Sequence, residues 1–163
     1  MDIQFLDEGI LRIKGARIVY RNFSGESTKY KQEGKRGFAV VIPNDEIAQT
    51  LINAGWPVKI KPPREEGEDP FRYLNVKFKL KNYAVGDKIV WSPKVYLKTN
   101  DSLNLLDDNG INMLDGSNIW IDHVDLDVRP YHWGDNDQIS AWLNILVVHQ
   151  KIDRSDELIT DLY

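Results

Sequence analysis

The stretch Tyr73-Leu74-Asn75-Val76-Lys77-Phe78-Lys79-Leu80-Lys81 alternates apolar and polar side chains without a break after its first residue. Successive side chains of a β-strand point to opposite faces of the sheet, so this alternation predicts a strand with one buried and one exposed face. The exposed face carries Lys77, Lys79 and Lys81. The stretch therefore predicts a β-sheet protein with a row of ammonium groups on one surface.

Short runs of β-branched and aromatic residues, bounded by Gly, Pro, Asn and Asp, extend the β prediction over most of the chain. We expect further strands within residues 11–20, 37–42, 58–60, 88–99 (interrupted by Pro93), 119–129 and 141–148. The apolar phase slips near Gly15 and again near Asp122 and His123, and each slip predicts a bulge or a bend. The run Asp107-Asp108-Asn109-Gly110 predicts a tight turn.

One helix is predicted after the second of these strands. Asn44 suits the N-cap, Asp45 and Glu46 suit the positive end of the helix dipole, and Gly55 supplies the stop. The apolar stripe of this helix comprises Ile47, Ala48, Leu51 and Ile52. Residues 62–70 are rich in proline, glycine and charge, which predicts an exposed loop.

The size and composition fit one folded domain. The chain has 163 residues, of which 42% are hydrophobic and 28% charged, enough apolar material for a core. The absence of cysteine excludes disulfides, thiolate metal sites and a cysteine nucleophile. We expect neither a signal peptide nor a membrane anchor, because no apolar run approaches the roughly 18 residues of a span. We predict a domain over residues 1–150 and a flexible acidic tail over residues 151–163.

The net charge of −4 conceals an asymmetry along the chain. Residues 1–98 hold 18 Lys and Arg against 12 Asp and Glu, a net of +6. Residues 99–163 hold 3 against 13, a net of −10. Such a sign asymmetry is typical of nucleic-acid binding combined with an acidic segment.

Basic side chains interleaved with aromatic rings indicate how a nucleic acid would be held. Cations neutralise phosphates, and flat rings stack on unpaired bases. The candidate DNA-binding residues are Tyr20, Arg21, Phe23, Lys29, Tyr30, Lys31, Lys35, Arg36, Arg64, Arg72, Tyr73, Lys77, Lys79, Lys81, Arg129, Tyr131 and Trp133. The plainer interpretation of the lysine row is a solvated strand face.

No catalytic or metal motif is evident. The three histidines, His123, His132 and His149, are too few and too scattered for a metal spacing. A cluster of Asp122, Asp125 and Asp127 leaves open a metal-dependent nuclease. Period-two geometry favours a solvent-facing role for the last two of these carboxylates. There is no Gly-x-Ser-x-Gly and no phosphate-binding glycine loop, so we predict neither catalysis nor a cofactor.

Several segments, taken in order, resemble the single-stranded DNA-binding proteins of bacteriophage replication systems. The matching segments are residues 16–23, 36–43, 54–59, 61–68, 73–77, 114–117, 124–131 and 139–143. The resemblance implies a mainly β, OB-fold-like Greek-key barrel. Because the predicted helix follows the second strand, the barrel would be an elaborated variant with extended loops. The DNA face that the resemblance implies comprises Tyr20, Arg21, Lys77, Lys79, Arg129 and Tyr131, with Lys35, Arg36 and Arg64 from loops.

The resemblance also implies a non-enzymatic protein that coats single-stranded DNA during phage replication or recombination. It would act without sequence preference in the cytoplasm of the infected bacterial host. A homodimer is one assembly that we consider for it. The tail would recruit a polymerase, helicase or primase through Asp156, Glu157, Asp161 and Tyr163. A β-rich structural module of the virion is a further alternative.

Overall fold

The computed structural model describes residues 1–26, 35–85, 88–116, 119–132 and 139–151. The elements are β1 (Asp2–Phe5), the 3₁₀ turn η1 (Asp7–Gly9), β2 (Leu11–Ala16), β3 (Ile18–Asn22), β4 (Arg36–Ile42), α1 (Asp45–Asn53), β5 (Val58–Lys61), β6 (Phe71–Phe78), β7 (Tyr83–Val85), β8 (Lys88–Val90), β9 (Lys94–Thr99), β10 (Ser102–Leu105), α2 (Asp108–Asn112), the 3₁₀ turn η2 (Met113–Asp115), β11 (Ile121–His132) and β12 (Ile139–Gln150). The predicted predominance of strands is confirmed.

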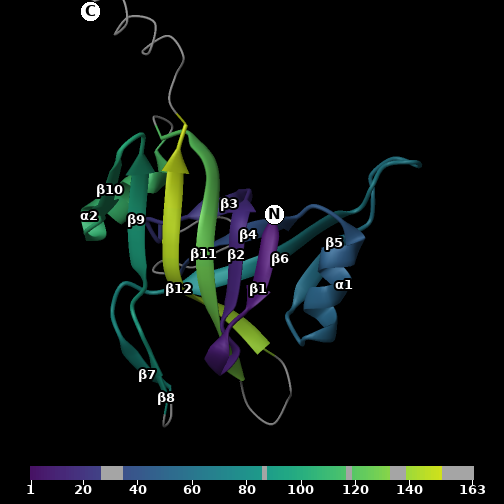
Figure 1. Cartoon of the computed structure of the whole chain (residues 1–163), viewed down its shortest axis with the longest axis horizontal. Helices are drawn as coiled ribbons and strands as arrows, with labels where there is room; N and C mark the ends of the chain where they lie inside the picture. The colour runs from purple at the N-terminus through teal and green to yellow at the C-terminus, as the bar shows by residue number, and fades with distance from the viewer. Residues whose placement is uncertain (27–34, 86–87, 117–118, 133–138, 152–163) are drawn as a thin grey trace, which may run out of the picture.

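The main strands form a strongly curved sheet in the order β1-β2-β11-β12-β6-β4-β3 (Figure 1). β6 and β12 run parallel, whereas β11 is antiparallel to both β12 and β2. Only Arg17 separates β2 from β3, so β11 and β4 pair with two halves of one N-terminal segment. This connectivity is that of the OB-fold, a partly open Greek-key barrel, and the predicted fold class is confirmed.

The predicted bend in the N-terminal strand is confirmed at Gly15. This residue has φ +69°, a left-handed conformation that glycine adopts without steric cost. The β2–β11 register shifts opposite it, between Val124 and Leu126. The bend lets the first strand continue from one side of the barrel to the other.

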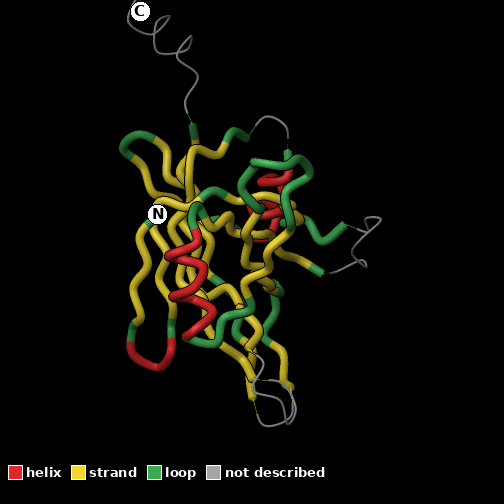
Figure 2. Tube along the Cα trace, turned by 90° about the vertical axis from the view of Figure 1, so that its right-hand side faces the viewer, coloured by secondary structure: helices red, strands yellow, loops and turns green. Residues whose placement is uncertain are grey.

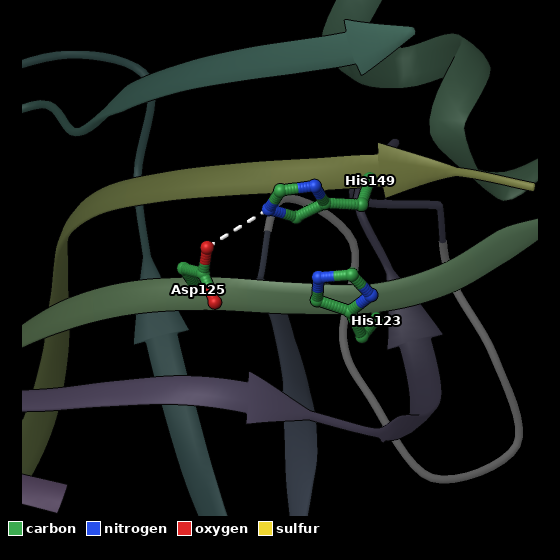
Figure 3. A group of neighbouring side chains, drawn as sticks. All are labelled: His123, Asp125 and His149. Carbon is green, nitrogen blue, oxygen red and sulfur yellow. Dashed lines mark hydrogen bonds and ion pairs between the residues drawn. The ribbon is translucent and has the colours of Figure 1, made fainter. Parts of the chain in front are cut away.

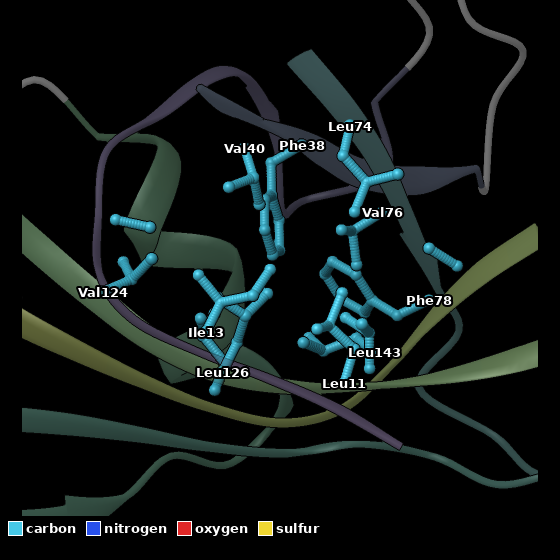
Figure 4. Packing of buried hydrophobic residues seen from close by; sticks show 14 of the residues in the cluster. Leu11, Ile13, Phe38, Val40, Leu74, Val76, Phe78, Val124, Leu126 and Leu143 are labelled. Atoms are coloured by element: carbon cyan, nitrogen blue, oxygen red, sulfur yellow. The ribbon is translucent and has the colours of Figure 1, made fainter. Parts of the chain in front are cut away.

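The inward faces of the long strands supply the core. Leu74, Val76 and Phe78 of β6 are all buried, as their alternation predicts. They meet side chains from β2, β4, β11 and β12 in one cluster (Figure 4). β6 ends at Phe78 because its partner β4 begins at Arg36, which pairs with Phe78. The prediction that the strand continues to Lys81 is therefore wrong for its last three residues.

The helix α1 begins and ends where the sequence predicts. The Asn44 side chain accepts a hydrogen bond from the Ile47 N–H at 2.9 Å, and Gly55 has φ +96°. Ala48 and Leu51 are buried, and α1 contacts β4 and β5. Figure 2 shows the helix in red against the yellow strands.

The prediction of a tight turn at residues 107–110 is wrong. Asp107 caps the short helix α2 instead, and its carboxylate accepts from the Gly110 N–H at 2.8 Å. Ile111 and Leu114 of α2 and η2 are buried in the core. An acidic N-cap and a turn use the same residue types, so this pattern did not separate them.

Strands β7 and β8 form a separate hairpin that projects from the barrel (Figure 1). Within the described ranges, no helix has the length and apolar character needed to cross a membrane.

Candidate nucleic-acid interface

The outward face of β6 continues across β12 to β11. Lys77 pairs with Trp142, and Trp142 pairs with Arg129. Paired residues on neighbouring strands direct their side chains to the same face of the sheet. At about 4.8 Å between strands, Lys77 and Arg129 start about 10 Å apart along this row. The sheet thus places two cations on either side of an indole ring.

A groove of about 400 Å³ runs along this face. Its lining residues are Lys35, Arg36, Gly37, Phe38, Asn75, Val76, Lys77, Phe78, Lys79 and Trp142. Four of these ten residues are basic and none is acidic, so the groove attracts anions. We call this surface the basic groove.

Tyr131 lies beside the basic groove. Its ring meets the Trp142 ring edge-on, with centroids 6.2 Å apart. Its hydroxyl donates to the Ile89 carbonyl at 3.2 Å, which ties β11 to the β7–β8 hairpin. The neighbouring Trp91 is 53% exposed, so a further aromatic surface is open to solvent near this hairpin.

An aromatic cluster lies at the other end of β6. Phe71 and Tyr73 stack with centroids 5.4 Å apart, and Tyr20 meets both rings edge-on at 6.3 and 6.1 Å. Lys61 Nζ lies 5.4 Å from the Tyr20 ring centroid and 5.7 Å from that of Tyr73. Tyr20 is 56% exposed, so a base could stack on it.

Phe23 does not belong to this surface, so its prediction as a stacking residue is wrong. It is fully buried and stacks on Phe38 at 5.5 Å in the core. The reason is local: Tyr20 has φ +55° and the β3–β4 register shifts between Val19 and Asn22. Tyr20 and Arg21 are therefore exposed, whereas Asn22 and Phe23 turn inward and are buried.

Arg36 and Arg72 both have partners on neighbouring elements of the fold. Arg36 Nη1 donates to the Phe23 carbonyl and, at 2.6 Å, to Asn112 Oδ1, so it fastens the end of β3 to α2 while also lining the basic groove. Arg72 is mostly buried, with its Nε 3.8 Å from Asp45 of α1. The prediction of Arg72 as a DNA contact is wrong in this arrangement, because the side chain points toward the helix.

Arg21 lies on a different surface from Lys77. Its Nη1 donates to the Leu114 carbonyl at 3.3 Å. With Arg17, Lys151 and the exposed Trp120 it lines a second cavity of about 550 Å³. The predicted residues are therefore distributed over two basic surfaces rather than one.

Four more of the predicted basic side chains are exposed, namely Lys35, Arg64, Lys79 and Lys81. Lys35 and Lys79 line the basic groove. Other predicted residues lie outside the described part of the chain, namely Lys29, Tyr30, Lys31, Trp133, Asp156, Glu157, Asp161 and Tyr163.

The three carboxylates considered for a nuclease do not form an open ligand set. Asp127 is 7% exposed and forms a bidentate ion pair with Arg12, at 2.8 and 2.9 Å. The expectation that Asp127 faces solvent is wrong, because Arg12 covers it. The hydrogen bond to Asp127, followed by its charge, raises the pKa of Arg12.

The other two carboxylates pair with histidines. The hydrogen bond with His123, at 2.7 Å, lowers the pKa of Asp122. Burial raises the pKa of Asp125, but hydrogen bonds from the Gly15 N–H and from His149 outweigh it, so the pKa is lowered overall. Both carboxylates therefore have fixed partners on β11, β12 and β2.

Lys61, Trp91 and Trp142 belong to these surfaces but were not predicted as binding residues. Trp142 stands in an apolar run, and Lys61 and Trp91 lie in short strands or beside them. The alternation of apolar and basic residues from Val58 to Lys61 is the signal that would have indicated Lys61.

Residues 4–161 match the family model described as a putative phage ssDNA-binding domain. The chain belongs to this family. The match spans nearly the whole sequence, and it confirms the resemblance to phage single-stranded DNA-binding proteins. No curated protein sequence matches the chain.

Solved structures of the same fold include the single-stranded DNA-binding protein from bacteriophage Enc34. Its superposition has a TM-score of 0.58 at 13% identity, covering 96% of this chain and 93% of that one. The structure of that protein in complex with ssDNA has a TM-score of 0.53 at 14% identity, covering 93% and 92%. A C-terminal truncation of it has a TM-score of 0.56 at 14% identity, covering 91% and 90%. At these identities the likeness shows a shared fold.

Proposed function

We propose that this family member binds single-stranded DNA through the basic groove and the adjoining aromatic cluster. The observation that carries the proposal is the row Lys77, Trp142 and Arg129, which brings two cations and an indole ring onto one face from three strands. The family membership and the likeness to a phage protein solved with ssDNA support it. The proposed role is strand coating in phage replication or recombination, without catalysis.

Lysine and arginine side chains would follow the phosphates while Tyr20, Tyr73 and Tyr131 offer rings to the bases. Phosphate neutralisation releases counterions and is independent of sequence. Stacking requires unpaired bases and therefore selects single strands over duplex. Since every base has a π-face, this combination gives affinity without sequence preference.

The proposal also covers where the protein acts and which partners it contacts. It would act in the cytoplasm of the infected bacterial host. The acidic residues of the tail would be captured by a basic pocket on a polymerase, helicase or primase, and a second copy of the chain could form a homodimer. The surplus of carboxylates near the C-terminus supports the first of these contacts.

The decisive experiment is quenching of tryptophan fluorescence by oligo-dT at several salt concentrations, with duplex DNA as the control. We expect tight, salt-dependent binding to the single strand and weak binding to duplex. Lys77→Ala should lower affinity about fivefold near 0.1 M salt and reduce the slope of log K against log salt by about 0.7, the value of one phosphate contact.

Lys14→Ala is the matched control, because Lys14 is an exposed strand lysine that does not line the basic groove. It should leave both quantities unchanged. Equal affinity for duplex, or equal effects of the two lysine substitutions, would overturn the proposed interface. Cleavage of a labelled single strand after addition of Mg²⁺ would instead support a metal-dependent nuclease. A complete lack of DNA affinity would support a structural module of the virion.

A further inference from the structure

Two histidines that are far apart in the sequence meet at one end of the barrel. His123 of β11 and His149 of β12 are cross-strand partners, and their rings stack with centroids 4.0 Å apart and planes 18° from parallel. Asp125 is two residues along β11, on the same face as His123. Figure 3 shows these three side chains turned toward one another. The expectation that the histidines are too scattered for a metal site is therefore wrong for two of them.

The distances within this group are close to those of a metal site. His149 Nε2 and Asp125 Oδ2 are 2.8 Å apart, and one potential ligand atom from each residue lies within 4.8 Å of the others. Zinc–nitrogen and zinc–oxygen bonds are about 2.0–2.2 Å, which places donor atoms of a tetrahedral site about 3.4 Å apart. Side-chain movements of about 1 Å would therefore bring all three donors around one ion.

Each of two potential ligands already has a partner that would orient it. His123 Nδ1 lies 2.7 Å from Asp122 Oδ2, and Figure 3 shows the other ring nitrogen turned toward Asp125 and His149. Asp125 Oδ1 accepts from the Gly15 N–H at 2.9 Å, so Oδ2 is the oxygen on the histidine side. Metal-bound histidines commonly donate their second nitrogen to a carboxylate in this way.

The group is accessible to an ion from solvent. The side chains of His123, Asp125 and His149 are 37%, 32% and 20% exposed. Two imidazoles and one carboxylate suit a borderline divalent ion such as Zn²⁺, whereas Mg²⁺ and Ca²⁺ prefer all-oxygen sites. Three protein ligands leave a fourth position for water.

We propose that His123, Asp125 and His149 form a Zn²⁺ site that fastens β11 to β12. The site lies at the opposite end of β11 from Arg129, so it is independent of the proposed DNA interface. The ion replaces the hydrogen bond between His149 and Asp125 and joins the two strands where β12 ends. Its role is structural, and bound zinc raises the thermal stability of the fold.

The test is calorimetric titration of the full-length, chelator-treated protein with zinc chloride near neutral pH. We expect one ion per chain and a zinc-dependent rise in Tm. His123→Gln and His149→Gln should each weaken zinc binding more than about 100-fold, and Asp122→Asn about 10- to 100-fold, as for an orienting carboxylate.

His132→Gln is the matched control, since His132 is exposed at the other end of β11 and should leave zinc affinity unchanged. Circular dichroism and oligo-dT binding check that each variant is folded. If the histidine variants do not fold, imidazole NMR of the unsubstituted protein decides, because zinc must shift the signals of His123 and His149 and not that of His132. Absence of saturable binding, or equal affinity in the three glutamine variants, would overturn the site.

Discussion

The two ends of β11 carry different sets of polar side chains. At one end Arg129 and Tyr131 lie next to Trp142, which lines the basic groove. At the other end Asp122, His123 and Asp125 form a carboxylate and imidazole group with β12. Both sets lie outward on one strand whose middle is buried, so a single long element supplies two different surfaces. A count of charges along the sequence cannot separate these two surfaces, because a residue's position along β11 determines the surface to which it belongs.

The buried middle of β11 connects the two ends, and Leu126→Ala should have the largest effect. Leu126 is 2% exposed within the core. Its truncation should lower the free energy of unfolding by about 2–5 kcal/mol, the usual loss for a buried leucine. Urea denaturation followed by fluorescence measures this. DNA binding and zinc binding should be lost together as urea unfolds the variant.

Leu103→Ala provides the control for this change. Leu103 is 58% exposed on β10, so the same truncation should alter the unfolding free energy by no more than about 0.5 kcal/mol. If the two variants were equally stable, the description of β11 as a strand through the core would be incorrect.

Arg129→Glu should affect only the DNA-binding end. One phosphate contact contributes about fivefold in affinity between 1 M and 0.1 M salt, and a reversed charge adds a repulsion of similar size. The affinity for oligo-dT should therefore fall roughly 25-fold at 0.1 M salt, measured by fluorescence quenching. Part of the loss will come from the hydrogen bond between Arg129 Nε and Asn144, which is 3.0 Å long.

Lys14→Glu repeats the same charge reversal on β2, away from the basic groove, and should change the affinity much less. Zinc affinity should be unchanged in the Arg129 variant. An equal loss from both reversals would mean that the total charge of the protein, and not this face, controls DNA binding.

The sequence predicted those parts of the fold that depend on local patterns. The alternation in β6, the bend at Gly15 and the cap at Asn44 each rest on a few neighbouring residues, and all three are confirmed. The five-residue helix α2 is too short to show a helical period, so its N-terminal cap was taken for a turn. Edge strands such as β1 and β10 gave no distinct pattern.

The candidate sites depend on strand pairing and were predicted only in part. The sequence indicated Lys77 and Arg129 separately, but their alignment needs the parallel register of β6 and β12 through Trp142. The meeting of His123 with His149 likewise comes from register and has no trace in their spacing. Pairing between distant segments is the physical information that a local pattern lacks.

The smallest effect should come from His149→Gln measured on DNA binding. His149 pairs with His123, which is six residues along β11 from Arg129, or about 20 Å at the rise of a strand. Exposed charges are screened within about 10 Å at 0.1 M salt, so a change at this end should alter oligo-dT affinity less than twofold. The same variant should lose zinc binding, whereas Arg129→Glu should lower DNA affinity and leave zinc affinity unchanged. A large loss of DNA affinity in His149→Gln, with the fold intact by circular dichroism, would place the DNA path over both ends of β11 and remove the distinction between them.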